Sequence, residues 1–92
     1  MRESEVELHF QWAVEMAGGK TYKTKCIGRV GFPDRLAKLP DGSLWLVELK
    51  TRGGRLSAAQ KQFAADMAGS NYAVLWDKQQ VDAWLKEALD GF

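Results

Sequence analysis

A β-hairpin predicted in the middle of the chain constrains the fold more than any other feature of the sequence. Two β-rich segments, 33–39 and 43–50, flank the turn sequence Pro40-Asp41-Gly42. Proline pre-sets the first turn angle of a three-residue loop, and glycine supplies the left-handed residue that closes such a loop with a bulge. The pattern therefore predicts two antiparallel strands in a fixed register.

The register of this hairpin brings charged side chains together. If Leu39 faces Ser43 across the loop, Asp34 lies directly opposite Glu48. Their Cβ atoms would be about 4.5–5.5 Å apart, where like charges destabilise a sheet, so a cation should lie between them. Because side chains alternate along a strand, Lys50 lies on the same face as Glu48.

Two carboxylates beside a lysine are typical of metal-dependent phosphodiester chemistry. Mg2+ accepts a few oxygen ligands and keeps its other positions for water and substrate phosphate. Asp34 and Glu48, together with a backbone carbonyl, would meet that demand. Lys50 would orient and help deprotonate an attacking water, or neutralise the charge that develops on the phosphate oxygens.

Each of these residues also has a simpler interpretation. An Asp after Pro is often only a turn residue, and a Glu-x-Lys on a strand is often a solvated edge with a weak ion pair. Glu48, however, interrupts the most apolar run of the chain, residues 44–49. Charged groups are rarely placed in such runs unless they are paired or ligating, which favours a functional site.

Three motifs extend the hairpin pattern along the chain. They are Gly28–Arg35, Val47–Thr51, and Gly54–Ser57 followed by Gln60. In this order and spacing the sequence resembles the virus-type replication-repair nuclease (VRR-NUC) domain of the PD-(D/E)XK nuclease superfamily, over nearly its whole length. The resemblance implies an α/β core, a mixed β-sheet flanked by helices in the order α-β-β-β-α-β-α.

The resemblance also implies a set of site residues. The family's metal ligands fall on Asp34 and Glu48, with the backbone carbonyl of Leu49 as a further ligand. Its catalytic lysine falls on Lys50 and its helix glutamine on Gln60. Mg2+ is the implied cofactor, with Mn2+ expected to substitute, and the sequence leaves open whether one or two ions act.

An acidic residue on the first helix often completes such sites, and here it falls on Glu7, with Glu3 as the alternative. Apolar residues alternate over Val6–Trp12, which is a strand signal, but a stripe at helical spacing that ends at Gly18-Gly19 favours a helix. Acids near a helix start also simply complement its dipole. His9 is expected to be an ordinary surface residue.

Gln60 has two interpretations. Ser57-Ala58-Ala59-Gln60 is a capping box, in which the glutamine returns a hydrogen bond to the backbone of Ser57. Gln60 also shares a helical face with Phe63 and Met67, so it points inward, toward a role beside the site or the substrate. Both interpretations stay open.

Basic residues gather in the middle of the chain although its net charge is only +1. Phosphate contact is the natural use of such a belt. The candidate DNA-binding residues are Lys23, Lys25, Arg29, Arg35, Arg52 and Arg55. For Lys23 and Lys25, on the predicted strand 20–27, the alternative is a strand edge guarded by lysines.

Composition sets the outer limits. With 92 residues, 46% of them hydrophobic, residues 1–92 are expected to form a single VRR-NUC-type nuclease domain that a homodimer would help to stabilise. The single Cys26 excludes an internal disulfide and suits a reducing cytoplasm. The chain has no apolar run long enough to suggest a membrane span.

The predicted order of elements is completed by a helix over 57–68, a strand over 72–76 and a last helix capped by Asp77. The passage from strand to helix to strand predicts that the last strand pairs in parallel.

Together, residues and resemblance predict a Mg2+-dependent DNA endonuclease of a bacterial or phage-infected cell. The resemblance implies replication, repair or recombination of phage type, and dimeric relatives that cut branched DNA such as Holliday junctions. A non-catalytic DNA-binding module on the same scaffold is the alternative. A structural protein-interaction domain is a third, supported by four tryptophans and the modest charge.

Overall fold

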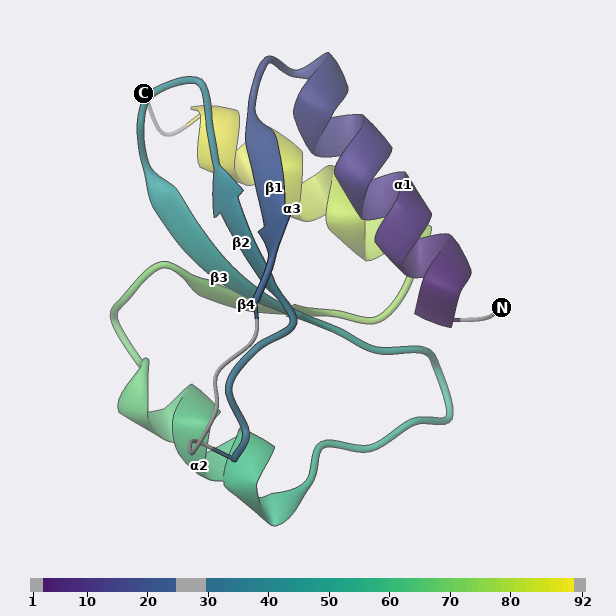
Figure 1. The fold of residues 1–92 in the computed structure, drawn as a ribbon, viewed down its shortest axis with the longest axis vertical. Helices are drawn as coiled ribbons and strands as arrows, with labels where there is room; N and C mark the ends of the chain where they lie inside the picture. Colours follow the sequence, from purple (N-terminus) through teal and green to yellow (C-terminus); the bar gives the residue numbers. More distant parts are fainter. Residues whose placement is uncertain (1–2, 25–29, 91–92) are drawn as a thin grey trace.

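The predicted order of helices and strands is confirmed by the structure. A computed structural model describes residues 3–24 and 30–90. The elements are α1 (Glu3–Met16), β1 (Lys20–Lys23), β2 (Arg35–Lys38), β3 (Leu44–Leu49), α2 (Ala58–Asp66), β4 (Tyr72–Leu75) and α3 (Lys78–Asp90) (Figure 1). Of the strand predicted over 20–27, β1 covers the first four residues, and residues 25–27 lie outside the described part.

The four strands form one mixed sheet in the order β1-β2-β3-β4. The first three are antiparallel neighbours, and β4 pairs in parallel with β3, as the strand-helix-strand pattern predicts. Leu36 pairs with Leu46 and Arg35 with Val47, which is the predicted hairpin register. Gly42 closes the turn with a φ of 87°, a conformation that glycine adopts without steric cost.

The first segment is a helix because its apolar residues recur at helical spacing. Val6, Phe10 and Val14 are fully buried on one side of α1. The helix stops where Gly18 adopts a φ of 97°. The N–H groups of Gly18 and Gly19 donate to the carbonyls of Glu15 and Val14, a Schellman arrangement that satisfies the last turn.

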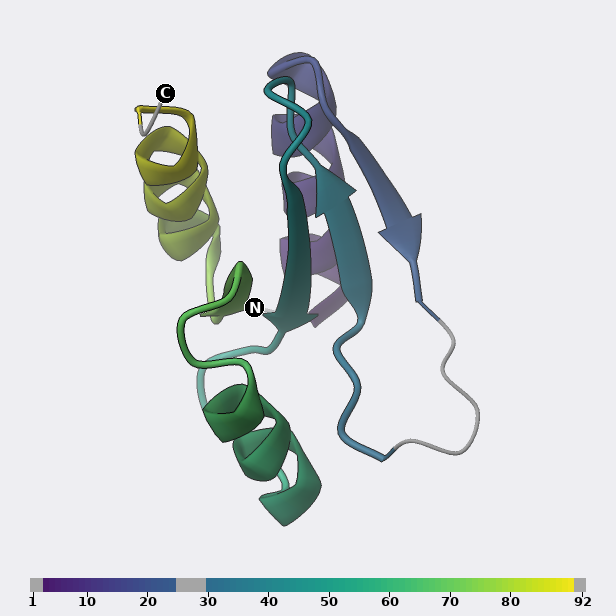
Figure 2. The ribbon, with the colours of Figure 1, turned by 90° about the vertical axis from the view of Figure 1, so that its left-hand side faces the viewer.

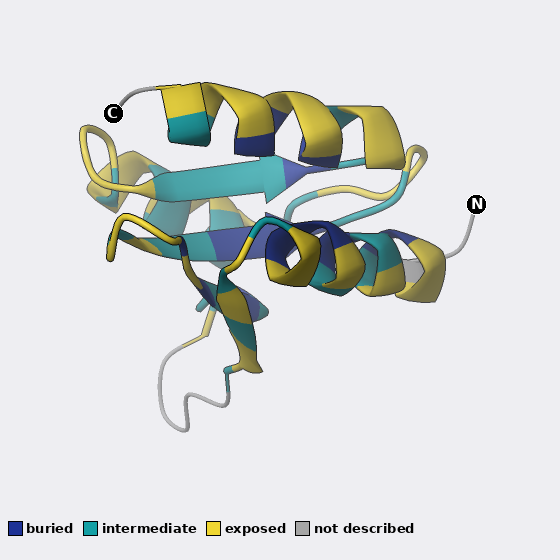
Figure 3. Cartoon of the chain, turned by 90° about the horizontal axis from the view of Figure 1, so that it is seen from above, coloured by how far each residue is buried: buried dark blue, intermediate teal, exposed yellow. Residues whose placement is uncertain are grey.

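The hydrophobic core lies between one face of the sheet and the helices α1 and α3. Helix α1 packs against α3 and against β1 and β3, and α3 packs along β4 (Figure 2). The buried residues of α3 lie on its inner side, while its outer turns are exposed (Figure 3). The core residues are Val6, Phe10, Ala13, Val14, Ala37, Leu39, Val47, Leu49, Leu75, Val81, Trp84 and Leu85.

The opposite face of the sheet carries α2, which stands apart from α1 and α3 (Figure 1). None of its residues is fully buried. Its main anchor is Phe63, whose ring lies 5.3 Å from that of Phe32 and 5.7 Å from that of Tyr72, measured between centroids. This arrangement places the hydrophobic core on one face of the sheet and α2, anchored by Phe63, on the other.

His9 differs from the expectation of an ordinary surface residue. Its side chain is 19% exposed and its Nε2 lies 2.7 Å from the Asp82 carboxylate, so it links α1 to α3. Its ring also contacts Trp12. The sequence could not indicate this bond, because Asp82 lies in the last helix.

Within the described part of the chain, no helix is long and apolar enough to cross a membrane.

Candidate metal and nucleic-acid site

The Asp34 carboxylate lies beside the backbone of β3. Extending the hairpin register by one residue sets Asp34 opposite Glu48. The N–H of Leu49 donates to Oδ2 of Asp34 over 3.1 Å, so this carboxylate is held next to the backbone between Glu48 and Lys50. On its other side, the carbonyl of Asp34 accepts from the N–H of Thr24 at 3.0 Å.

Glu48 is a buried acid in the middle of the sheet. Its relative exposure is 2%, and β3 is flanked by β2 and β4 on its two sides. Val47 and Leu49, its neighbours in sequence, are fully buried in the core on the other face. Glu48 therefore lies on the face opposite the core, which is the face predicted for the carboxylate pair.

Lys50 directly follows β3 and keeps the extended course of the strand. Its N–H donates to the carbonyl of Leu75 over 2.9 Å, so pairing with β4 continues one residue past Leu49. Alternation along the strand then places Lys50 on the face of Glu48. The carbonyl of Leu49, the predicted backbone ligand, lies between these two residues in the chain.

Tyr72 belongs to the same face, although the sequence predicts it only as the first residue of the strand 72–76. It pairs with Leu46 across the parallel ladder, while Val74 pairs with Glu48. Burial raises the pKa of the Tyr72 hydroxyl, and the negative charges of Glu48 and then Asp34 raise that pKa further. Both carboxylates therefore lie near enough to this hydroxyl to affect its pKa.

The donor set suits a hard divalent cation. Two carboxylates, one of them buried, present oxygen ligands of the kind that Mg2+ binds while keeping water on its remaining positions. Within residues 3–24 and 30–90, no group of three or more His, Cys, Asp or Glu side chains is placed to hold a metal ion. The pair would thus share the ion with backbone, water or substrate oxygens.

Glu7 lies against the other side of β2. Its carboxylate lies 3.2 Å from Nη2 of Arg35 and 3.9 Å from Nζ of Lys23. Arg35 is buried, with 8% of its side chain exposed, because it shares the core face with Ala37. The structure therefore brings Glu7 to two of the predicted DNA-binding residues, and its role in a metal site stays a prediction, as does that of Glu3.

Gln60 forms the capping box that its sequence context predicts. Its N–H donates to the hydroxyl of Ser57 at 3.1 Å, and its Oε1 accepts from the N–H of Ser57 at 2.8 Å. The cap interpretation is confirmed. A further role of Gln60 beside the site stays a prediction.

The remaining basic candidates differ in their surroundings. Arg52 is 79% exposed and forms an ion pair with Asp77 at 2.8 Å. Asp77 caps α3, and the N–H of Gln80, followed by the Arg52 guanidinium, lowers the pKa of its carboxyl. Arg55 is exposed, and Lys23 exposes 73% of its side chain. Lys25 and Arg29 lie outside the described residues.

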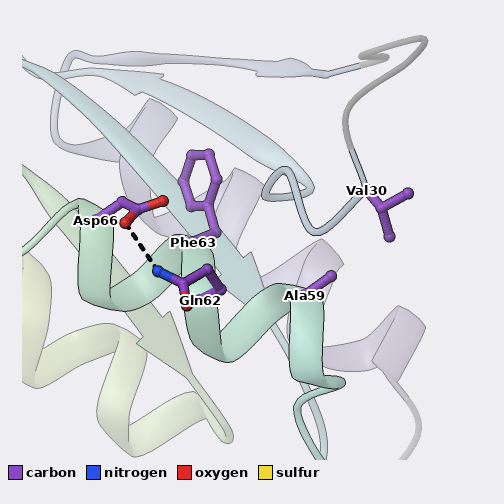
Figure 4. A pocket seen from close by; sticks show the side chains of 5 residues that line it. All are labelled: Val30, Ala59, Gln62, Phe63 and Asp66. Atoms are coloured by element: carbon purple, nitrogen blue, oxygen red, sulfur yellow. Dashed lines mark hydrogen bonds between the residues drawn. The ribbon is translucent and has the colours of Figure 1, made fainter.

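A shallow pocket of about 270 Å³ lies beside α2. It is lined by Val30, Ala59, Gln62, Phe63 and Asp66. Figure 4 shows the Phe63 ring pointing from α2 toward the sheet, and the Gln62 amide hydrogen-bonded to the Asp66 carboxylate at 3.0 Å. Because Phe63 also contacts Tyr72, this pocket borders the face that carries the carboxylate pair.

Known proteins resemble the chain over most of its length. It is 34% identical over 86 residues to "Putative nuclease p44" of Acyrthosiphon pisum secondary endosymbiont phage 1, and this alignment covers 92% of each chain. A solved structure described as a VRR_NUC domain superposes with a TM-score of 0.83 at 30% identity, covering 91% of this chain and 94% of its own. No family model matches the chain.

Proposed function

The chain belongs to the VRR-NUC family, and on that premise we propose that it is a Mg2+-dependent endonuclease that hydrolyses DNA phosphodiester bonds. The position of Asp34 opposite Glu48 in the extended hairpin register carries the proposal. The Leu49 N–H holds one carboxylate beside the strand that bears the other, and both charges act on Tyr72. A divalent cation is the natural neutraliser of such a pair.

The residues of this face have different roles in the proposed hydrolysis. Asp34, Glu48 and the Leu49 carbonyl would hold the ion. When bound, the ion supplies a Lewis acid that polarises a phosphate oxygen and lowers the pKa of water. A water oxygen bonds to phosphorus and loses a proton, the bond from phosphorus to a sugar oxygen breaks, and that oxygen gains a proton. Lys50 orients the water or neutralises charge on the phosphate oxygens.

Exposed basic residues supply the contact with the nucleic-acid backbone. Lys23, Arg52 and Arg55 are exposed and suit phosphate contacts, whose number sets the salt dependence of binding. We propose branched DNA as the preferred substrate, in replication, repair or recombination of phage type. The family resemblance supports this preference.

Single substitutions of Asp34 or Lys50 should slow cleavage strongly without unfolding the chain. Asp34→Asn keeps an oxygen that can accept from the Leu49 N–H but removes the charge, and Lys50→Met removes the ammonium. We expect either variant to cleave at least about 100-fold more slowly than the native chain. The assay compares labelled junction, flap, nicked and linear DNA in Mg2+, in Mn2+ and in a chelator.

Two exposed residues provide matched controls, Asp41→Asn on the hairpin loop and Lys38→Met on β2. Both controls should cleave normally, and thermal unfolding should show all four variants folded. Full activity of Asp34→Asn or Lys50→Met would contradict the assigned roles. Salt-dependent DNA binding by the native chain, without cleavage in Mg2+ or Mn2+, would favour a non-catalytic binding module instead.

The homodimer expected from the small size of the chain stays a prediction. Leu8, Trp12 and Met16 follow one another at helical spacing on α1, and each exposes more than half of its surface, at 66%, 59% and 70%. This stripe supports the packing of a second copy against α1. A molar mass in solution of twice the 10.3 kDa chain would agree with a dimer, and the mass of one chain would contradict it.

A further inference from the structure

Tyr72 is fixed on the carboxylate face by two independent constraints. Its backbone pairs in parallel with β3, opposite Leu46, which is two residues before Glu48 and on the same face of the sheet. Its ring lies 5.7 Å from that of Phe63 on α2. The side chain is therefore held between the sheet and α2, next to the strand that bears Glu48.

The hydroxyl of Tyr72 is buried, and it forms no hydrogen bond with any described residue. A buried hydroxyl without a partner is costly, so native proteins usually give such a group a partner or a role. Glu48 lies on the adjacent strand and on the same face of the sheet as Tyr72. The negative charges of Glu48 and Asp34 both raise the pKa of this hydroxyl. Ionised carboxylates accept hydrogen bonds only, and a hydroxyl can donate one.

We propose that Tyr72 is a positioning residue of the candidate metal site, whose hydroxyl donates a hydrogen bond to the carboxylate pair of Asp34 and Glu48 when the site holds its ion. The inference rests on the proposed function, because it concerns the same pair of carboxylates. A hydrogen bond from a hydroxyl to a charged oxygen is short and strong, so it fixes the orientation of the carboxylate that accepts it. Partners of this kind govern how tightly metal ligands hold their ion.

The test compares Mg2+ binding by the full chain with Tyr72→Phe, measured by isothermal titration calorimetry. Phenylalanine keeps the ring that packs on Phe63 and removes only the hydroxyl. We expect its Mg2+ affinity to fall by about 10- to 100-fold. Its unfolding midpoint without metal should not fall, because the hydroxyl that is lost has no partner among the described residues.

Tyr22→Phe is the matched control, because Tyr22 is 52% exposed on β1. This variant should bind Mg2+ as the native chain does. The ultraviolet absorption of tyrosine provides a second measurement that is independent of cleavage. Adding Mg2+ should change this absorption in the native chain and in Tyr22→Phe, and the change should be lost in Tyr72→Phe.

The outcomes separate this inference from the proposed function. If Asp34→Asn loses Mg2+ binding while Tyr72→Phe keeps native affinity, the role of Tyr72 is wrong and the metal site stands. If Asp34→Asn binds Mg2+ as tightly as the native chain, the metal site itself is wrong and the inference falls with it. A Tyr72→Phe variant that unfolds more readily without metal would indicate a structural role and contradict the proposal.

Discussion

Acidic side chains in this chain have very different surroundings, although the sequence shows them only as Asp and Glu. Asp41 is exposed and holds the hairpin turn by accepting from the N–H and hydroxyl of Ser43. Asp77 caps a helix, and Glu48 is buried on the face of the sheet opposite the core. A buried acid needs compensation by opposite charge or hydrogen bonds, which is why Glu48 is the strongest candidate for a functional role.

The contact between Glu7 and Arg35 predicts a structural role for Glu7. Arg35 is buried, so removing the negative charge beside it leaves a guanidinium poorly compensated. We expect Glu7→Gln to lower the free energy of unfolding by about 2 kcal/mol and to keep Mg2+-dependent cleavage. Urea unfolding measures the first effect and a junction-cleavage assay the second.

Glu15→Gln, an exposed change on the same helix, is the control for that experiment and should leave both quantities unchanged. Native stability combined with lost cleavage in Glu7→Gln would instead support the first-helix acid that the family resemblance implies.

Sequence patterns located the carboxylate pair but not all of its surroundings. Asp34 and Glu48 could be paired because the short hairpin loop fixes their register. Arg35 lies on the same side of its strand as the buried Ala37 and Leu39, a signal that would have placed it in the interior. Tyr72 could not be placed, because its neighbours depend on a parallel pairing made across the whole of α2.

At the level of elements, the loop before β2 fixes the position of α2. Gly31 has a φ of 90°, and a Cβ added there would lie 2.5 Å from the carbonyl oxygen of Ala59. The backbone of this loop therefore packs directly on α2, and the contact between Phe32 and Phe63 reinforces it. The same loop leads into Asp34, so the docking of α2 and the position of one carboxylate are linked.

Gly31→Ala should therefore destabilise the chain more than backbone strain alone explains. Gly42→Ala is the matched control, because Gly42 has a φ of 87° and nothing lies within 4 Å of the added Cβ. We expect Gly42→Ala to cost about 1–3 kcal/mol through its strained backbone, and Gly31→Ala to cost more because it also clashes with α2. Denaturant unfolding compares the two, and equal losses would contradict the close packing of the loop.

The order of elements followed from the sequence because each element carries its own local signal. The stripe of α1, the hairpin turn and the capping box of α2 all involve residues close in the chain. The position of α2 had no such signal, since none of its residues is fully buried and Phe63 is its main anchor. The link between His9 and Asp82 likewise joins two distant helices.

On the scale of the whole molecule, the sheet separates the hydrophobic core from the candidate metal site. One face packs against α1 and α3, where Phe10, Trp45 and Trp84 form a chain of ring contacts. The other face carries Glu48, Tyr72 and the anchor of α2. Substitutions in the carboxylate pair can therefore change chemistry while the core stays intact, which is what the cleavage experiments require.

Anomalous diffraction from a crystal of the full chain soaked in Mn2+ is the decisive measurement for the proposed metal site. We expect an anomalous peak between the carboxylates of Asp34 and Glu48, within coordination distance of both and close to the Leu49 carbonyl. Diffraction that shows no ion there, or that shows the two carboxylates turned toward opposite faces of the sheet, would contradict the proposed metal site.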